Sequence, residues 1–260
     1  MIDPFQQFIQ ERQQQIAGYP HDKAFIAQSQ AWLEASMRRR YVYNFDWLGR
    51  PIIQYPQDMV AFQELVWSTR PDLIIETGIA HGGSLVLSAS LLSILDYCDA
   101  VSANALLDPR AGKRKVLGVD IDIRLHNRRA IDSHPLAHKI QMIEGSSISS
   151  EIIAKVQAFA RDYHRVMVCL DSNHTHEHVL AELLAYAPLT TPGCYCIVFD
   201  TFVQDMPADL FPDRPWKQGN NPKTAVHQFL KTNNEFVIDK SMNHKLMISV
   251  APDGYLKRVE

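Results

Sequence analysis

Acidic residues end five successive apolar segments of this sequence, and they are its strongest chemical signal. The acids are Glu76, Asp120, Glu144, Asp171 and Asp200. Ligands of open α/β sheets bind beyond the carboxyl ends of the strands. Packing alone does not place so many carboxylates along one edge, because each must be solvated or paired. We therefore expect these acids to mark a binding site.

Three of these acids have an expected partner. Asp120 follows the second apolar segment and is placed to accept hydrogen bonds from ribose hydroxyls. Asp171 and Asp200 end adjacent predicted strands, so their carboxylates can converge on one hard cation such as Mg²⁺. The alternative is that a strand-end acid caps the next helix. For Glu144, capping is as good an interpretation as ligand binding.

A glycine-rich turn follows the first acid. Leu73–Ile75 form an apolar run without alternation, as in a strand buried on both faces, and Gly78, Gly82 and Gly83 precede an apolar helix from Ser84. Such glycines let the backbone approach a ligand. The spacing is neither the dinucleotide G-x-G-x-x-G nor a P-loop. It resembles the first motif of class I methyltransferases, in which the acid faces the cationic ligand S-adenosylmethionine. The alternative is a plain turn with glycines for close packing.

Three histidines follow Asp171. The run Asp171–His178 superficially resembles the H-x-H-x-D-H zinc signature of metallo-β-lactamase-like hydrolases, but Glu177 stands where that signature needs Asp, and the α/β order does not match that fold. If a helix begins at Thr175, His174 faces the binding edge and is a candidate general base, because its ordinary pKa lies near working pH. We expect His176 and His178 to lie at the surface or to pack helices.

The order of the predicted elements gives the fold class. Helices and strands alternate after an N-terminal helical stretch at about residues 3–40. The predicted strands cover residues 73–76, 115–120, 139–144, 165–170 and 193–199, followed by two antiparallel strands at 235–238 and 245–250. We predict an α/β, Rossmann-like class I methyltransferase fold: a mostly parallel seven-stranded sheet with helices on both faces and an antiparallel C-terminal hairpin. Residues 1–57 are expected to form a helical or lid extension and residues 58–260 the methyltransferase domain.

Composition narrows the class of protein further. A net charge of −3 argues against broad binding to nucleic acid. We expect no membrane span, because no apolar run approaches the roughly 20 residues that one needs, and the polar N-terminus does not resemble a secretory signal. The four cysteines lack C-x-x-C pairing, which favours reduced thiols and a cytoplasmic location. The apolar residues of the N-terminal segments favour a homo-oligomer.

Taken together, the motifs resemble the cephalosporin hydroxylase-like family, which includes rhamnosyl O-methyltransferases. The resemblance covers roughly residues 41–230, and its motifs are Trp47–Gln54 with Pro56 and Asp58, Arg70–Ser84, Gly118–Asp122, Glu144–Ser147 and Asp171–His174 with His178-Val179. Members resemble S-adenosylmethionine-dependent O-methyltransferases. The resemblance implies a set of cofactor-binding residues, with Ser146 and Ser147 near the adenine: Glu76, Thr77, Gly78, Gly82, Gly83, Ser84, Asp120, Ile121, Gly145, Ser146, Ser147 and Asp171.

The resemblance also implies a metal site at Asp171 and Asp200, with Asp171 as a possible base. The family has an acidic pair at the end of the fifth strand, where this chain has Phe199-Asp200. Water, Asn173 or Asp205 can replace the missing ligand, or the protein works without Mg²⁺. A cation at Asp171 and Asp200 would lower the pKa of the acceptor hydroxyl. Without it His174 is the better base, and the sequence does not decide between the two.

We predict an S-adenosylmethionine-dependent O-methyltransferase that acts on a sugar hydroxyl of a glycolipid, polysaccharide or glycosylated natural product. Methyl transfer needs in-line positioning and removal of a proton from the acceptor oxygen, because the sulfonium is already activated. Two alternatives come from other classes. A nicotinamide-dependent oxidoreductase uses the same kind of sheet, but the glycine spacing argues against it. A non-catalytic cofactor-binding protein is supported by Phe199.

Overall fold

A seven-stranded sheet forms the centre of the computed structural model, which describes residues 3–260. Its strands are β3 (Leu73–Thr77), β4 (Lys115–Asp120), β5 (Ile140–Glu144), β6 (Val166–Leu170), β7 (Tyr195–Val198), β8 (Phe236–Ile238) and β9 (Tyr255–Arg258). The strand order is β5-β4-β3-β6-β7-β9-β8, with β9 antiparallel to both of its neighbours and the other pairs parallel. This arrangement confirms the predicted class I methyltransferase fold, with an antiparallel C-terminal pair.

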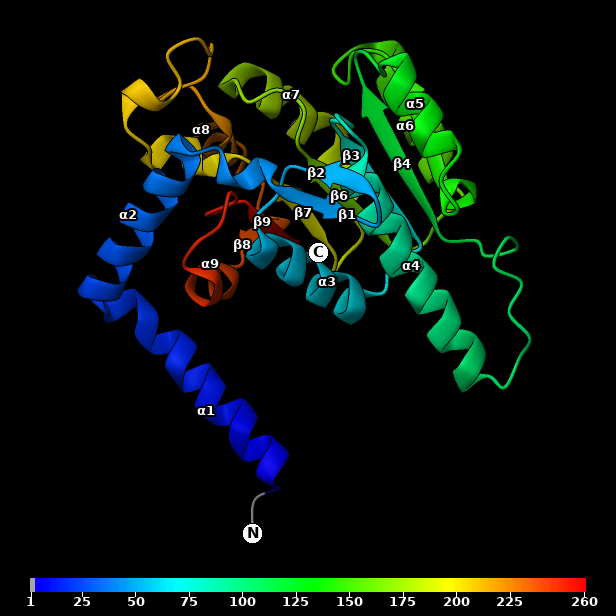
Figure 1. The fold of residues 1–260 in the computed structure, drawn as a ribbon, viewed down its shortest axis with the longest axis horizontal. Coiled ribbons are helices and arrows are strands. Elements are labelled where there is room, and N and C mark those ends of the chain that lie inside the picture. The colour runs from blue at the N-terminus through cyan, green and yellow to red at the C-terminus, as the bar shows by residue number, and fades with distance from the viewer. Residues whose placement is uncertain (1–2) are drawn as a thin grey trace.

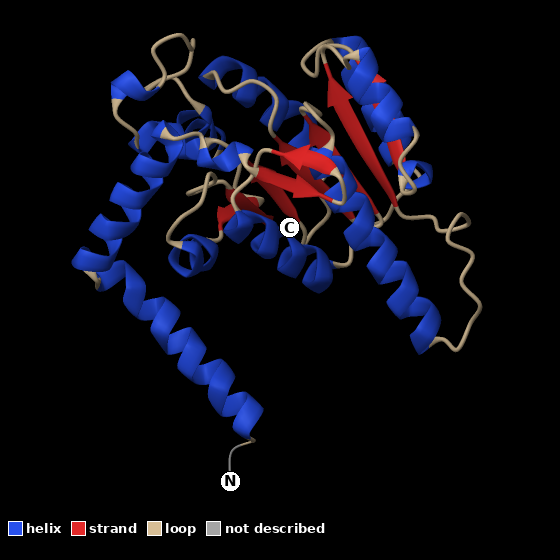
Figure 2. Ribbon diagram, viewed as in Figure 1, coloured by secondary structure: helices blue, strands red, loops and turns tan. Residues whose placement is uncertain are grey.

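Helices cover both faces of the sheet (Figures 1 and 2). Side chains alternate along each strand, so Ile74 packs into the core beneath one helical layer while Leu73 and Ile75 pack beneath the other. The first layer contains α3 (Pro56–Thr69), α4 (Gly83–Ser102), α5 (Leu125–Asp132) and α9 (Lys240–Leu246). The second contains α6 (Ser150–Ala160), α7 (His176–Tyr186) and α8 (Pro222–Phe229).

The last strand lies later in the chain than predicted. Residues 245–250 were expected to form it, but they contain the end of α9 and a loop, and the strand is Tyr255–Arg258. The apolar run resembles a strand, yet its backbone bonds to a buried carboxylate: the Val250 N–H donates to Asp58 Oδ2 (3.0 Å) and the Ser249 hydroxyl to Asp58 Oδ1 (2.6 Å). A long-range contact thus replaces the strand pairing that the local pattern suggests.

A small hairpin lies over the start of α4. It consists of β1 (Phe45–Trp47) and β2 (Arg50–Ile52), in a segment predicted only as a lid or cap. The Trp47 indole N–H donates to Ser90 Oγ at 3.0 Å. A Cβ on Gly83 would lie 2.2 Å from the Pro51 carbonyl oxygen, so this glycine permits the close approach of the two backbones. The hairpin therefore closes one side of the sheet edge at which the acids gather.

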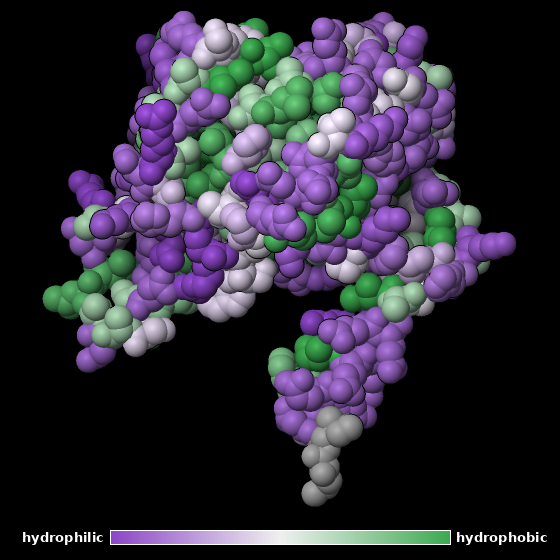
Figure 3. Space-filling model, turned by 180° about the vertical axis from the view of Figure 1, so that it is seen from behind, coloured by the Kyte–Doolittle hydropathy of each residue, from purple (hydrophilic) through white to green (hydrophobic). Residues whose placement is uncertain are grey.

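Two helices precede this core. The helix α1 (Pro4–Gly18) has no buried residue, and α2 (Lys23–Arg38) buries only a few. Figures 1 and 3 show α1 extending away from the body, and its surface is mostly hydrophilic in the rear view, although Phe5 and Phe8 are exposed. The division at residue 57 stays a prediction.

One helix is long and apolar enough to cross a membrane by length and composition, which differs from the expectation drawn from the sequence. It is α4, and half of its apolar window is buried in the fold. Leu85, Val86 and Leu92 on this helix are fully buried. Packing against the sheet accounts for this apolar character, as is usual for the helix after the first strand of such a fold.

Candidate functional site

The strand-end acids lie along one edge of the sheet, as the sequence predicts. Asp120 ends β4, and Asp171 and Asp200 follow β6 and β7, while Glu76 is the penultimate residue of β3. Because these four strands are consecutive neighbours in the sheet, their side chains line one cleft. The cleft has three connected parts: an inner pocket at Glu76, an open part at Asp171 and a third part at Asp120.

The glycine turn after β3 has a conformation that only glycine adopts easily. Gly78 has φ +90°, and a Cβ there would lie 2.1 Å from the Asp171 carbonyl oxygen. Gly82 has φ +82° and immediately precedes α4, where a Cβ would meet the Ile131 side chain at 2.5 Å. Gly145 has φ +149° and precedes Ser146 at the end of β5. These glycines therefore let the turns pack closely against neighbouring segments of the chain, above all Gly78 against the Asp171 backbone.

Backbone N–H groups hold the Asp120 carboxylate in place. Ile79 and Ala80 donate to its Oδ2 at 2.7 and 3.3 Å, and Asp122 donates to Oδ1 at 3.1 Å. Gly78, Ile121, Ser146 and Ser147 line the same part of the cleft, so five of the residues predicted to bind cofactor come together here. The next helix, α5, begins at Leu125.

His178 also lies in this part of the cleft, which the sequence analysis did not foresee. Its Nε2 is 3.1 Å from Ser147 Oγ and 3.2 Å from Ser172 Oγ. His176, by contrast, joins helices as expected: its ring nitrogens are 2.8 Å from Thr224 Oγ1 and 3.0 Å from Gln228 Oε1 on α8. His176 and His178 are two positions apart on α7, which begins at His176, so their side chains point in different directions from the helix.

The inner pocket contains carboxyl groups in an apolar setting. Glu76 is 4% exposed and accepts a hydrogen bond from the Ser84 hydroxyl. Burial raises the pKa of Glu76 to about 8, and burial likewise raises the pKa of Asp58 to about 6. Gln54 Oε1 and Ser88 Oγ, both in this pocket, are buried without a hydrogen-bond partner among residues 3–260. These unsatisfied groups favour a polar ligand here.

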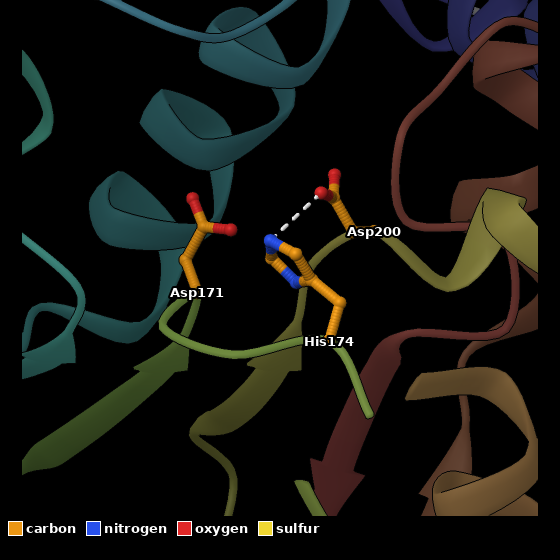
Figure 4. A group of neighbouring side chains, drawn as sticks. All are labelled: Asp171, His174 and Asp200. Atoms are coloured by element: carbon orange, nitrogen blue, oxygen red, sulfur yellow. Dashed lines mark ion pairs between the residues drawn. The ribbon is translucent and has the colours of Figure 1, made fainter. Parts of the chain in front are cut away.

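Asp171, His174 and Asp200 form a cluster in the open part of the cleft (Figure 4). One ligand atom from each lies within 4.8 Å of the others. His174 Nε2 is 3.1 Å from Asp200 Oδ2, and the imidazole lies between the two carboxylates. Burial, followed by repulsion from Asp200, raises the pKa of Asp171 well above its ordinary value. This arrangement can hold a cation or move a proton.

The residues proposed to replace a missing metal ligand do not face this cluster. Asn173 Oδ1 accepts the Thr175 N–H and hydroxyl, both at 2.9 Å, at the start of α7. Asp205 forms an ion pair with Lys223 at 2.7 Å. Phe199 is buried against the α3 layer and lines the inner pocket. His174, which the sequence suggested only as a base, takes the third position beside the two aspartates.

Two other residues named in the sequence analysis have side chains that do not line the cleft. Thr77, predicted to contact cofactor, is fully buried, and its side chain bonds to the Asp171 N–H at 3.4 Å; it supports the cleft from behind. Glu144 neither caps a helix nor lines the cleft. It pairs with Arg128 at 3.2 Å, while Ser149 caps α6. Glu144 was assigned by its strand-end location and Thr77 by the family resemblance, and neither shows which way a side chain points.

The fold and the glycine turn define the class: this is a class I S-adenosylmethionine-dependent methyltransferase fold, with a parallel sheet, an antiparallel final strand and an acid after the second strand. The chain belongs to the Rhamnosyl O-methyltransferase/CmcI family, whose model matches residues 39–259. It is an O-methyltransferase. This confirms the family and the activity that the sequence motifs predicted.

Individual proteins give the same assignment. The chain is 28% identical over 207 residues to a rhamnosyl O-methyltransferase of Mycobacterium tuberculosis, covering 77% of this chain and 73% of the relative. It is 25% identical to that of Mycobacterium leprae, over 84% and 85% of the two chains. Among solved structures, CmcI with Mg and SAM has a TM-score of 0.54 at 18% identity, covering 84% of this chain and 78% of the other. Apo CmcI has a TM-score of 0.53 at 16% identity, covering 84% and 77%.

Proposed function

We propose that this protein transfers the methyl group of S-adenosylmethionine to a sugar hydroxyl of a glycolipid, polysaccharide or glycosylated natural product. The observation that carries the proposal is the Asp171–His174–Asp200 cluster, which opens into the same cleft as the Gly78 turn. Membership in a family of rhamnosyl O-methyltransferases supports the sugar as acceptor. The cleft thus offers a cofactor side and an acceptor side that meet at Asp171.

The described residues fit S-adenosylmethionine. Gly78 lines both open parts of the cleft, so a ligand that extends from one part to the other would pass this turn. Asp120 would bind the ribose hydroxyls, with Ile121, Ser146 and Ser147 around the adenine. Glu76 and Ser84 would face the cationic methionine portion, because a buried carboxyl without a cationic partner favours a positive ligand. Gly82, Gly83 and Gly145 shape the turns.

His174 is the proposed general base. Its ring lies in the open part of the cleft, and Asp200 holds Nε2 at 3.1 Å. A carboxylate that accepts one ring N–H orients the imidazole and leaves the other nitrogen to accept a proton. The acceptor hydroxyl, held near this ring, would lose its proton as the methyl group arrives. The rest of the rate enhancement comes from positioning of the two reactants.

The same cluster fits Mg²⁺. The oxygens of Asp171 and Asp200 are the ligands this ion prefers, and it usually keeps several waters besides one or two carboxylates. Mg²⁺ would supply a Lewis acid that lowers the pKa of the acceptor hydroxyl. Imidazole binds this ion less well than a carboxylate does, so His174 keeps its proposed role as the general base. The donor set therefore suits both uses.

Turnover with a panel of acceptors tests the proposal. The protein is incubated with S-adenosylmethionine and neutral or charged rhamnosides, with and without Mg²⁺, and S-adenosylhomocysteine is measured with the methylated product. Acceptor-dependent formation of both is expected, and His174→Gln should remove it while retaining cofactor binding. Cofactor binding with no turnover on any sugar of the panel would contradict the proposed sugar acceptor. A homo-oligomer and a cytoplasmic location stay predictions.

A further inference from the structure

Two arginine–aromatic pairs flank the cleft beside the Asp171–His174–Asp200 cluster. The Arg40 guanidinium lies 4.7 Å from the centre of the Tyr43 ring, and Tyr43 lines the open part of the cleft. The Arg214 guanidinium lies 5.1 Å from the centre of the Trp216 ring. Trp216 in turn packs edge-on against His174, with ring centres 4.8 Å apart. Both pairs therefore adjoin the reacting centre, from segments far apart in the sequence.

Other contacts hold these two segments together. Arg38, at the end of α2, donates to both carboxylate oxygens of Asp209 at 3.0 and 3.2 Å, which joins the Arg40 segment to the loop that carries Trp216. Asn220 further along that loop accepts the His176 N–H at 2.9 Å and donates to the Pro215 carbonyl at 2.9 Å. Trp216 is thus held against His174 by a loop that is bound at both ends.

The two guanidinium groups are free to bind a ligand. Arg38 is engaged by Glu34 and Asp209, and the Arg39 side chain donates to the Ala35 carbonyl. Arg40 and Arg214 are exposed and form no ion pair or side-chain hydrogen bond within residues 3–260. Stacking over an aromatic ring holds a guanidinium in place while leaving its N–H donors available. Asp213, beside Arg214, is exposed and does not pair with it.

We propose that the acceptor sugar carries an anionic group, a phosphate or a carboxylate, which Arg40 and Arg214 bind while the sugar hydroxyl reaches His174. Guanidinium matches either anion with two parallel hydrogen bonds. The two arginines lie at the rim of the cleft, so they would hold the anion there, and this sets which hydroxyl faces the methyl group. The rings of Tyr43 and Trp216 give apolar flanks for the sugar ring. This inference rests on the proposed function.

Binding to the protein saturated with S-adenosylhomocysteine tests the inference. L-Rhamnose 1-phosphate, methyl α-D-glucuronide, neutral methyl α-L-rhamnoside and inorganic phosphate are titrated separately by calorimetry. At least one anionic sugar should bind about tenfold more tightly than the neutral rhamnoside. Arg40→Gln and Arg214→Gln should each weaken binding of the anionic sugar by about tenfold and leave binding of the neutral sugar unchanged. Arg110→Gln is the matched control, since Arg110 is exposed in the loop before β4, at the opposite edge of the sheet.

The separate titrations distinguish a phosphate from a carboxylate, and they distinguish failure of this inference from failure of the proposed function. Tight binding of the sugar phosphate alone identifies phosphate, and tight binding of the glucuronide alone identifies carboxylate; either supports the inference. Equal binding of neutral and anionic sugars, insensitivity to both arginine substitutions, or no sugar binding at all overturns it. S-Adenosylhomocysteine binding is measured first in every variant. If the unchanged protein does not bind S-adenosylhomocysteine, the proposed function itself is contradicted. If it binds S-adenosylhomocysteine but does not prefer an anionic sugar, only this inference is contradicted.

Discussion

The proposed cofactor side and the proposed acceptor side of the cleft are built in different ways. On the cofactor side, Asp120 receives N–H groups from Ile79 and Ala80, so turns directly after β3 and β4 form the site from the backbone. On the proposed acceptor side, His174 packs against Trp216 and lines the same part of the cleft as Tyr43. These residues come from segments far apart in the chain, which side-chain contacts such as Arg38–Asp209 join. A site formed by backbone turns can be predicted from the local sequence, whereas a site formed by side chains from distant segments depends on the tertiary fold.

The largest expected effect separates chemistry from binding. Asp171→Asn should lower turnover by about 100- to 10,000-fold, because it removes the ionisable carboxyl group beside the proposed base His174. Cofactor affinity should change little, since Asp120 and the Gly78 turn are untouched. Turnover measured beside calorimetric titration with S-adenosylhomocysteine checks both parts. Loss of cofactor binding in this variant contradicts the assigned roles.

A substitution on the proposed cofactor side should weaken cofactor binding directly. Asp120→Ala removes a carboxylate that would make two charged hydrogen bonds to ribose, so affinity for S-adenosylhomocysteine should fall about 100-fold or more. Asp122→Ala is the matched control, because Asp122 is an exposed neighbour whose backbone, not its side chain, contacts Asp120. Equal losses in the two variants, measured by calorimetry, count against a ribose contact at Asp120.

The two sides also differ in how far the sequence could predict them. The strand-end acids, the glycine turn and the sheet order follow from local patterns, because buried strands and tight turns have their own residue requirements. The hairpin over α4 could not be predicted from local patterns. Nor could the final strand at Tyr255–Arg258, because the apolar run at Ser249-Val250 bonds to Asp58 from a distant part of the chain and does not form that strand. His178, Gln54 and Trp216 were missed for the same reason: only the fold shows which side chains reach the cleft.

Proton release sharpens the role of Glu76. Its pKa of about 8 in the free protein leaves the carboxyl mostly protonated at pH 7, and a cationic ligand favours the charged form. Binding of S-adenosylmethionine should therefore release close to one proton, and affinity should rise as pH rises, by up to about tenfold per unit below pH 8. Calorimetry at pH 7 in buffers of different ionisation enthalpy measures the release. Glu76→Gln should abolish it and Glu144→Gln should not.

The smallest effect concerns the contact that joins the two rim segments. Arg38 and Asp209 are both substantially exposed, so Arg38→Gln should change the free energy of unfolding very little. Affinity for S-adenosylhomocysteine should not change, while the KM for the acceptor should rise. Denaturant unfolding and steady-state kinetics test these three statements. A weaker cofactor complex would show that the two sides are not as separate as the contacts indicate.

The most direct test of the account is calorimetric titration of the purified protein with S-adenosylmethionine, S-adenosylhomocysteine and NAD⁺, each with and without Mg²⁺. The account predicts tight binding of the two methionine-derived ligands, none of NAD⁺, and loss of binding in Asp120→Ala. Binding of NAD⁺ in preference to S-adenosylmethionine, or silence toward both methionine-derived ligands, would contradict it.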